Sequence, residues 1–350
     1  SLARMLDGMG LVHIRLLEIE SEPEEDAAEE NSEERRKRLR QMARKTFSKA
    51  MSTVKDVMNL AGNDEEINVA QTKRVIHNLI DRIAEDESSM IELTALRNFD
   101  EYTYVHSTNV CVYALTIGVR IGLDRARLAQ LGLAALFHDI GKVRLSSDLI
   151  NKPGAFDEDD WVQMQRHPIL GSKTALRNLE LDIHTARVAR VCFEHHINAD
   201  FTGYPLLRYG QRPSNLFSRI VAIVDTFDAL TSGRVYIKHA NTSDEVIRKM
   251  HYQMAIKFDA LLLKTFTDVV GVYPAGSLVL LSTDEVALVL SHNEIDRTRP
   301  QVKIIGDRSG MFEEPIFAEL TDGSSTDRYI TRIIDAEKHG IDLSRIISAD

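Results

Sequence analysis

Two short blocks of metal-binding residue types constrain this chain more than any other feature. Residues 138–142 read His-Asp-Ile-Gly-Lys, and residues 195–205 read His-His-Ile-Asn-Ala-Asp-Phe-Thr-Gly-Tyr-Pro. Adjacent imidazoles and carboxylates are poor material for an apolar core, because each polar group needs a partner once it is buried. A metal cluster, in contrast, needs these groups side by side. We therefore treat the two blocks as parts of one candidate site and ask which other residues complete it.

Further histidines and aspartates extend the candidate site along the chain. Five of the twelve histidines fall in one ordered set of predicted helical segments, and two aspartates join them. Imidazole and carboxylate ligands together suit Fe, Mn, Zn or similar divalent ions. A bridging carboxylate with several imidazoles can hold two ions about 3.5–4 Å apart, which lowers the pKa of a bridging water and stabilises displacement at phosphorus. The candidate ligands are His106, His138, Asp139, His167, His195, His196 and Asp225.

Each candidate ligand has an ordinary explanation when it is taken alone. A single His106 is more often structural or exposed, and His167 before a proline could simply end a helix. Asp225 could be a buried carboxylate that accepts hydrogen bonds. Cys192, one turn before His195, is more typical of a buried core thiol than of a soft ligand. The metal interpretation therefore depends on the whole set and not on any one residue.

The apolar residues indicate a mainly helical chain that ends in a small β-rich module. Hydrophobic residues make up 43% of the 350 residues and aromatic residues only 6%, so aliphatic side chains form the core. A chain of this length has about two or three domains. We expect an N-terminal segment with an acidic linker and a long amphipathic helix (1–62), a helical domain (63–267), and a β-rich module with a terminal helix (268–350).

Local signals predict where the elements begin and end. Apolar residues at spacings of three and four predict helices, Asp64 is a candidate cap for the helix that follows it, and Asp157 with Asp160 resembles a capping box. The helix that begins there is expected to stop at His167-Pro168. Expected helices cover 33–60, 101–120, 124–137, 182–196 and 215–231, expected strands cover 278–281, 286–290 and 302–305, and 327–347 is expected to be helix plus turn.

Charge and cysteine content narrow the classes of partner. The formal net charge of −10 argues against a nucleic-acid polymer or an anionic membrane as partner, although metal ions could still attract a small anionic substrate. No apolar run approaches the ~20 residues of a membrane span, so no membrane insertion is expected. Two isolated cysteines suggest a reducing compartment, which predicts a cytoplasmic protein. The amphipathic helix around 33–60 is either a packing helix or a surface for a homodimer or a signalling partner.

Four blocks together resemble the HD-GYP family, which comprises bacterial phosphodiesterases of cyclic dinucleotides within the HD superfamily. Two are the blocks described above, a third is His-Pro-Ile-Leu-Gly at 167–171, and the fourth is Asp-Thr-Phe-Asp-Ala-Leu-Thr-Ser-Gly-Arg at 225–234. Their order and spacing match between about residues 95 and 290. The resemblance implies a mainly α, HD-type helical bundle, here with an N-terminal helical extension and a small β-rich C-terminal module.

The resemblance also implies a role for each matching residue. All seven candidate ligands match family metal ligands for two divalent ions, Fe or Mn, and Asp139 matches the residue that bridges them. Lys142 matches a lysine near the scissile phosphate, where a cation stabilises developing charge. Arg234 matches an arginine that engages phosphate. The substrate loop is matched by Gly203, Tyr204 and Pro205, and Asp228 is interpreted as a structural residue that holds a helix or loop by hydrogen bonds.

Three departures from the family pattern affect this site. Many members carry Glu one helical turn before the first histidine, where it holds a third metal, but this chain has Tyr102. The loop has Ile197, Asn198 and Phe201 where the family pattern has Glu, Arg and Gly. Ile237 takes the place of a basic residue, with Lys238 one step away. The first departure predicts two metals, and the other two affect substrate contacts more than metal binding.

Hydrolysis of a cyclic dinucleotide is the function that these observations favour. Cyclic di-GMP is the expected substrate and a linear dinucleotide the expected product, with Asp139 and Lys142 as catalytic residues. A metal-bridging hydroxide would attack phosphorus. An alternative is a metal-binding receptor or scaffold with weak or no hydrolysis, and a third is an HD enzyme acting on another phosphoester such as a cyclic GMP-AMP dinucleotide.

Overall fold

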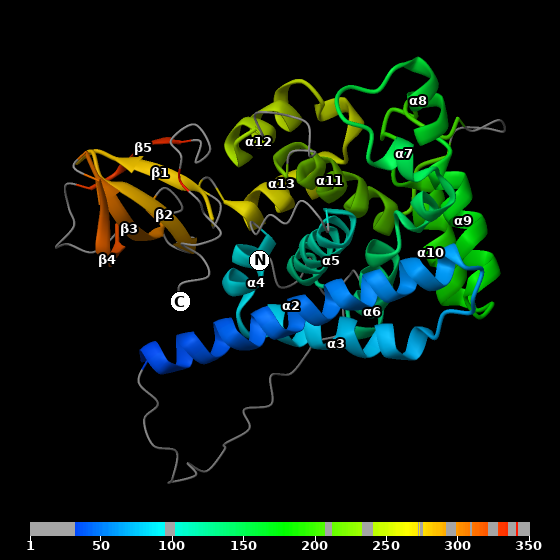
Figure 1. Ribbon diagram of the computed structural model, residues 1–350, viewed down its shortest axis with the longest axis horizontal. Coiled ribbons are helices and arrows are strands. Elements are labelled where there is room, and N and C mark those ends of the chain that lie inside the picture. The colour runs from blue at the N-terminus through cyan, green and yellow to red at the C-terminus, as the bar shows by residue number, and fades with distance from the viewer. Residues whose placement is uncertain are drawn as a thin grey trace, which may run out of the picture. The chain divides into compact units, whose positions relative to one another are not determined.

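The computed structural model describes residues 32–94, 102–206, 212–232, 241–271, 273, 276–291, 299–308, 310–320, 328–334 and 341. Helices come first along these residues and strands follow (Figure 1). The helices are α2 (Ser32–Gly62), α3 (Val69–Glu85), α4 (Glu87–Thr94), α5 (Tyr102–Arg120), α6 (Arg125–Leu136), η2 (Ile140–Arg144), α7 (Ser147–Ile150), α8 (Glu158–Met164), α9 (His167–Asn178), α10 (Ile183–Glu194), α11 (Leu216–Thr231), α12 (Ser243–Tyr252), η3 (Ala255–Lys257) and α13 (Ala260–Val270).

The long helix α2 confirms the helix expected from about residue 33. Its buried positions recur at spacings of three and four, so one apolar stripe faces the core. That stripe contains Ala43, Phe47, Ala50, Val54, Val57, Met58 and Ala61. These residues belong to the same core cluster as the following helices, and the Nη1 of Arg82 on α3 donates a hydrogen bond to the Met42 sulfur at 3.7 Å. A packing role for α2 is thus observed, whereas a dimer through this helix stays a prediction.

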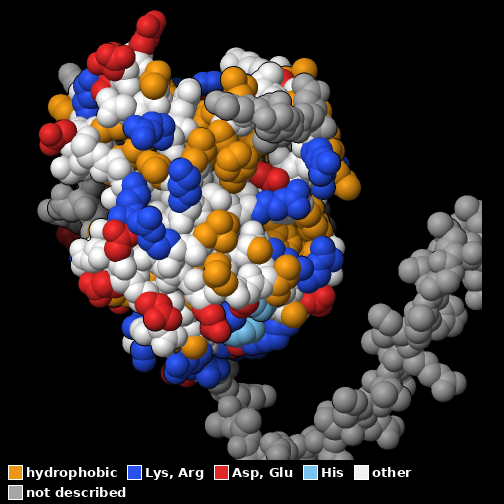
Figure 2. All heavy atoms as spheres, turned by 90° about the vertical axis from the view of Figure 1, so that its right-hand side faces the viewer, with side chains coloured by type: hydrophobic (Ala, Val, Ile, Leu, Met, Phe, Trp, Pro, Cys, Tyr) orange, Lys and Arg blue, Asp and Glu red, His pale blue; other side chains and the backbone are white. Residues whose placement is uncertain are grey.

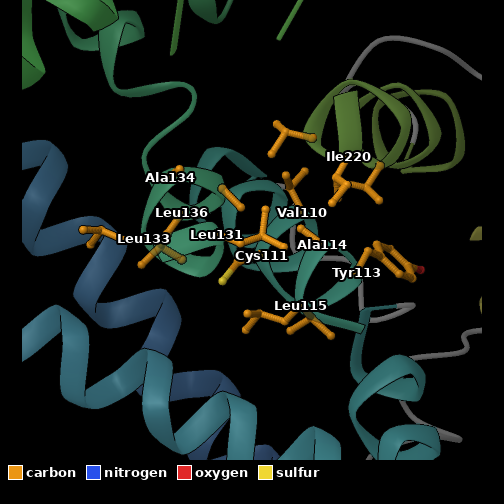
Figure 3. Packing of buried hydrophobic residues seen from close by; sticks show 14 of the residues in the cluster. Val110, Cys111, Tyr113, Ala114, Leu115, Leu131, Leu133, Ala134, Leu136 and Ile220 are labelled. Carbon is orange, nitrogen blue, oxygen red and sulfur yellow. The ribbon is translucent and has the colours of Figure 1, made fainter. Parts of the chain in front are cut away.

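Helix α5 runs through the middle of the core and carries the first candidate ligand. Most of its residues are buried, because α6, α11 and α13 pack around it. Figure 3 shows Val110, Cys111 and Leu115 of α5 beside residues of α6 and Ile220 of α11. A helix buried on nearly all sides is held rigidly, since protein interiors are close-packed. The core therefore fixes the backbone from which His106 projects.

Helix-capping signals were partly right and partly wrong. The box formed by Asp157 and Asp160 does cap α8. Asp64, however, is not the cap of α3: it lies in a turn with φ of 60°, and Asn68 accepts the capping hydrogen bond from Ala70 N at 3.0 Å instead. His167 does not end a helix either; it is the first residue of α9, because proline is favoured at the first positions of a helix.

The C-terminal strands form one antiparallel sheet with the order β4-β3-β2-β1-β5. The three expected strands are confirmed, and two further strands complete the sheet. The five are β1 (Leu278–Leu281), β2 (Val286–Ser291), β3 (Gln301–Asp307), β4 (Gly310–Glu319) and β5 (Ile330–Ile333). The prediction of helix plus turn for 327–347 is wrong at β5, whose residues pair with β1. Residues 327, 335–340 and 342–347 of the predicted terminal segment lie outside the described residues.

The sheet has buried clusters of its own. Val279, Ala287, Val289, Val302 and Ile304 form one of them with residues of the later strands. This cluster contains none of the residues of the helical core cluster. The helix α13 ends at Val270, three residues after the boundary expected from the sequence. The three-segment division of the chain stays a prediction.

The surface gives two simple observations. Figure 2 shows acidic and basic side chains interspersed with apolar ones on the face that it displays. Within the part of the chain that the structure describes, no helix is long and apolar enough to cross a membrane.

Candidate metal centre

The seven predicted ligands come from five separate parts of the helical core. His106 projects from α5, His138 and Asp139 lie between α6 and η2, and His167 begins α9. His195 and His196 follow α10, and Asp225 lies on α11. Their ligand atoms fall into three groups in which all atoms lie within 4.8 Å of one another: His167 with His195 and His196, His106 with His138 and Asp139, and His138 with His195 and Asp225. The structure therefore brings all seven predicted residues together.

Three of the histidines are oriented by the same kind of hydrogen bond to the backbone. Each Nδ1 donates a hydrogen bond to the carbonyl oxygen three residues earlier, in the last turn of a helix: His138 to Ala135 at 2.7 Å, His167 to Met164 at 2.8 Å and His195 to Cys192 at 2.8 Å. Carbonyl groups in the last turn of a helix are not all taken up by the helix's own hydrogen bonds, so they can accept from a side chain. Because a carbonyl can only accept, Nδ1 carries the proton in each ring. Each Nε2 atom is left facing the site.

Two aspartates each span two groups of imidazoles. One oxygen of Asp139 lies 3.3 Å from His167 Nε2, and the other lies 3.5 Å from His106 Nε2 and 3.4 Å from His138 Nε2. Asp225 repeats this arrangement, with Oδ1 3.1 Å from His106 Nε2 and Oδ2 3.6 Å from His196 Nδ1. Both carboxylates are almost fully buried. Such carboxylates can join two cation positions.

The donor set fits metal ions because several buried atoms lack a satisfactory partner. Among the residues that the structure describes, His138 Nε2 and Asp139 Oδ1 find no hydrogen-bond partner, although both atoms are buried. His167 Nε2 and His195 Nε2 lie 3.2 Å apart, and since both Nδ1 atoms carry the protons, two lone pairs face each other. Facing lone pairs repel unless a proton or a metal cation lies between them. Orphaned buried acceptors converging on one centre thus fit a cation site.

The electrostatics favour positive charge at this centre. Burial lowers the pKa of His167 to about 3 and that of His195 to about 4, so both imidazoles are neutral and ready to coordinate. Burial also disfavours charge on His138, but Asp139 and Asp225 outweigh it and raise the pKa of His138 to about 10. Although burial opposes ionisation of Asp139, Lys142 and nearby imidazoles hold its pKa well below the usual value. The ionised Asp139 beside the neutral His167 and His195 offers donors that divalent ions bind, whereas His138 must release a proton in order to coordinate.

Two glycines allow the backbone segments of the site to meet. A Cβ on Gly141 would lie 2.0 Å from His167 O and 2.3 Å from Gly171 N, a distance that real side chains do not tolerate. The glycine therefore lets η2 approach α9 closely enough to bring Asp139 beside His167. Cys192 packs on this contact as a buried thiol, 3.3 Å from the Cβ position of Gly171, and donates to Phe137 O. It is a core residue, as the sequence suggested.

Comparison with known protein families identifies the family to which this helical bundle belongs. Residues 78–262 match the HD domain family, which is more than half of the chain. The chain belongs to the HD domain family. His138 and Asp139 lie within the matched residues, and the predicted resemblance to the HD-GYP group of this family is confirmed by the named relatives.

Three curated relatives give the range of similarity. A cyclic di-GMP phosphodiesterase of Pseudomonas aeruginosa is 29% identical over 81% of this chain and 67% of its own length. A 3'3'-cGAMP-specific phosphodiesterase of Vibrio cholerae is 36% identical over 39% of this chain and 28% of its own length. A cyclic di-GMP phosphodiesterase response regulator of Xanthomonas campestris is 33% identical over 41% of this chain and 37% of its own length. The chain thus spans about two thirds of the first relative and about a third of the other two.

A solved structure supports the fold of the HD domain. An HDG"Y"P protein from Bdellovibrio bacteriovorus superposes with a TM-score of 0.54 at 17% sequence identity, covering 66% of this chain and 72% of the other. At this identity the likeness concerns the fold alone. It agrees with the helical HD-type bundle expected from the sequence.

The predicted substrate-side residues are only partly described. Lys142 Nζ contacts Asp139 Oδ2 and its side chain is partly exposed, so it lies at the solvent-facing edge of the site. Tyr204 lies against the ligand set, with its ring centroid 4.5 Å from that of His196, whose side chain is 25% exposed. Gly203 and Pro205 flank it, and Ile197 pairs with Gly203 in an isolated bridge. Arg234, Ile237 and Lys238 lie outside the described residues.

The departures from the HD-GYP pattern have definite structural settings. Tyr102 stacks on His106, with ring centroids 5.9 Å apart and ring planes 8° from parallel. Phe201, in place of the family's glycine, has φ of 64°. Few residues other than glycine adopt this region. The loop thus keeps a glycine-like conformation without the glycine.

Two buried residues beside His106 were missed or given too small a role. Asp228 Oδ2 accepts from His106 Nδ1 at 2.7 Å, and Asn109 Nδ2 donates to Asp228 Oδ1 at 2.8 Å. The sequence does contain a signal for Asp228, since it lies three residues after Asp225 and so shares a helix face with it. No pattern in the sequence pointed to Asn109.

Proposed function

We propose that this chain is a metal-dependent phosphodiesterase that hydrolyses a cyclic dinucleotide, with cyclic di-GMP as the first candidate substrate. The observation that carries the proposal is the pair of buried aspartates, Asp139 and Asp225, each of which faces two groups of imidazoles. The names of the relatives support the substrate class, since cyclic di-GMP and 3'3'-cGAMP both occur among them.

Two divalent ions, Fe or Mn, are the cofactor that we infer. His167, His195 and His196 would hold one ion, and His106 and His138 the other, with Asp139 and Asp225 shared. Mixed imidazole and carboxylate donors suit these metals. When bound, such a pair supplies an activated water and neutralises charge on the phosphate.

The residues around the ions would orient the phosphodiester. Lys142 is held beside Asp139 by their ion pair, so its ammonium group can approach a phosphate oxygen and balance the charge that develops there. Tyr204, whose ring lies against His196, would border the bound nucleotide with Gly203 and Pro205. Arg234 is proposed as a second phosphate contact on the resemblance alone.

Tyr102 limits the number of ions that we propose. A neutral phenol is a weak ligand near pH 7, and this one already stacks on His106. A third ion would therefore lack a carboxylate at this position. Two ions suffice for one in-line displacement, so we propose the linear dinucleotide as the main product.

A second candidate function rests on the loop between His196 and Gly203. Phe201 at φ of 64° and the buried Ile197 replace residue types that the family uses toward substrate. A chain with intact metal ligands and an altered substrate loop would bind a cyclic dinucleotide but hydrolyse it slowly. Such a protein would act as a receptor or scaffold, and a signalling protein would be its partner.

Turnover and binding of cyclic di-GMP separate these two functions. The protein is purified with Mn²⁺ or Fe²⁺ under reducing conditions and compared with Asp139→Ala and with Asp159→Ala, an exposed residue of α8. The enzyme proposal predicts a linear product whose rate falls about 100-fold or more in Asp139→Ala and stays unchanged in Asp159→Ala. Tight nucleotide binding without product would support the receptor, and failure to bind either dinucleotide would contradict both.

A further inference from the structure

His106 differs from the other inward-facing histidines in the partner of its Nδ1 atom. His138, His167 and His195 lie at helix ends, where carbonyl oxygens of the last turn orient their rings. His106 lies within α5, whose carbonyl groups accept the hydrogen bonds of the helix itself. Its ring therefore needs a partner from another element. Asp228 of α11 supplies it, with a distance of 2.7 Å between Asp228 Oδ2 and His106 Nδ1.

Asp228 is itself held by a buried network. Asn109 Nδ2 donates to Asp228 Oδ1 at 2.8 Å and to Thr94 O, the last residue of α4, at 3.1 Å. Asp228 is 2% exposed and Asn109 is 1% exposed. Since both neighbours point a donor at Asp228, only a group with two acceptor oxygens satisfies both. An amide of the same shape would have to aim an N–H group at one of the two donors.

We propose that Asp228 is a positioning residue that fixes the ring orientation and tautomer of His106 and thereby sets the affinity of the ion that His106 binds. The inference rests on the metal site of the proposed function. A carboxylate behind a metal-binding imidazole holds the ring and increases the basicity of the coordinating nitrogen. Asn109 orients the Asp228 carboxylate by donating a hydrogen bond to it. Through these hydrogen bonds, α4 and α11 help to orient His106.

The contact between Asp228 and His106 predicts that loss of the Asp228 carboxylate lowers the affinity for one of the two ions. His106 belongs to the group with His138 and Asp139, while His167, His195 and His196 form a group without it. Loss of the carboxylate at Asp228 should weaken the first position and spare the second. Partners of this kind change metal affinity by about 10–100-fold.

Metal titration of Asp228→Asn tests the inference without measuring turnover. Metal-free wild type, Asp228→Asn and Thr116→Val are titrated with Mn²⁺ against a chromophoric chelator, and bound metal per chain is counted. Thr116 is a suitable control because it is fully buried on α5, the helix that carries His106, and its Oγ1 donates to Val112 O at 2.9 Å within the helix. We expect two ions in wild type and Thr116→Val, and in Asp228→Asn one ion of unchanged affinity and one weakened about 10–100-fold. Raising Mn²⁺ should restore the second ion.

The outcomes distinguish this inference from the proposed function. Wild type that binds no metal contradicts the metal site itself. If wild type and Asp228→Asn bind two ions with equal affinity, the positioning role is overturned and the metal site is not. The positioning role is also overturned if Thr116→Val loses as much affinity as Asp228→Asn. If Asp228→Asn fails to fold, Asn109→Ala tests the same hydrogen-bond network. It should lower the affinity for the ion that His106 binds by a smaller factor than Asp228→Asn. Unchanged affinity in Asn109→Ala would then overturn the inference.

Discussion

At the scale of single residues, the site depends on which atom of each side chain faces the centre. Four imidazoles present Nε2 because their Nδ1 atoms are engaged elsewhere, three by backbone carbonyl groups and one by Asp228. Asp139 and Asp225 each direct their two oxygens toward different imidazoles, and the second oxygen of Asp225 faces His196. Each ligand is thus oriented before a metal arrives, which reduces the entropy that binding must overcome.

Asp225→Asn should weaken both ions while leaving the fold intact. The substitution removes a charge that faces His106 at 3.1 Å and His196 at 3.6 Å, and it leaves the volume unchanged. We expect turnover of cyclic di-GMP to fall about 100-fold or more, which corresponds to about 2.7 kcal/mol in the barrier. The matched control is Asp268→Asn on α13, which should keep full activity in the same assay. Equal activity of the two variants would contradict a role for Asp225 in the site.

Phe201 offers a test of backbone conformation in the substrate loop. Its φ of 64° is costly for any residue with a Cβ, so glycine should be preferred there over alanine. We expect Phe201→Gly to exceed Phe201→Ala in free energy of unfolding by about 1 kcal/mol, measured by urea denaturation. In an ordinary helix the order of the two would be reversed. Finding alanine to be the more stable substitution would mean that the loop has another conformation.

At the scale of elements, the contact between η2 and α9 depends on glycine. Gly141→Ala would place a Cβ 2.0 Å from His167 O, so the two segments must move apart. We expect a loss of about 3 kcal/mol or more in unfolding free energy, together with weaker metal binding. Gly62→Ala, at a helix position with open space around it, should be neutral or slightly stabilising. Urea denaturation of both variants checks this, and equal stability would show that η2 and α9 are farther apart.

The sequence predicted those elements whose signals are local. Apolar spacing located α2 and α5, and the capping box located α8, because neighbouring residues specify these features. The edge strand β4 was missed because most of its side chains are exposed and it contains Glu313, Glu314 and Pro315. It forms by pairing with β3, which no local pattern reveals. Asn109 was missed for the same reason, since its partner Asp228 is 119 residues away.

The ligand set was predictable because its residues are chemically unusual for a core. Adjacent His and Asp residues at predicted helix ends pointed to a metal, and the structure brings all seven together. The sequence did not predict that Asp139 and Asp225 would each face imidazoles from different helices. This arrangement depends on the packing of α5, α9, α10 and α11 around a common centre.

At the scale of the whole molecule, metal binding should contribute to stability. The helices of the core converge on acceptors that lack partners, so an ion that binds only the folded chain stabilises it. At a free metal concentration 100 times the dissociation constant, one ion adds about 2.7 kcal/mol. We expect EDTA to lower the thermal midpoint by several degrees and Mn²⁺ to restore it. The midpoint of Asp139→Ala should respond much less, and equal midpoints of wild type with EDTA and Mn²⁺ would contradict this expectation.

The central claim is that two ions lie between the imidazole groups, joined by Asp139 and Asp225. Anomalous diffraction from crystals of the Mn²⁺-loaded protein tests it directly. We predict two peaks about 3.5–4 Å apart, one beside His167, His195 and His196 and the other beside His106 and His138. A single peak, or no peak among these residues, would contradict the account.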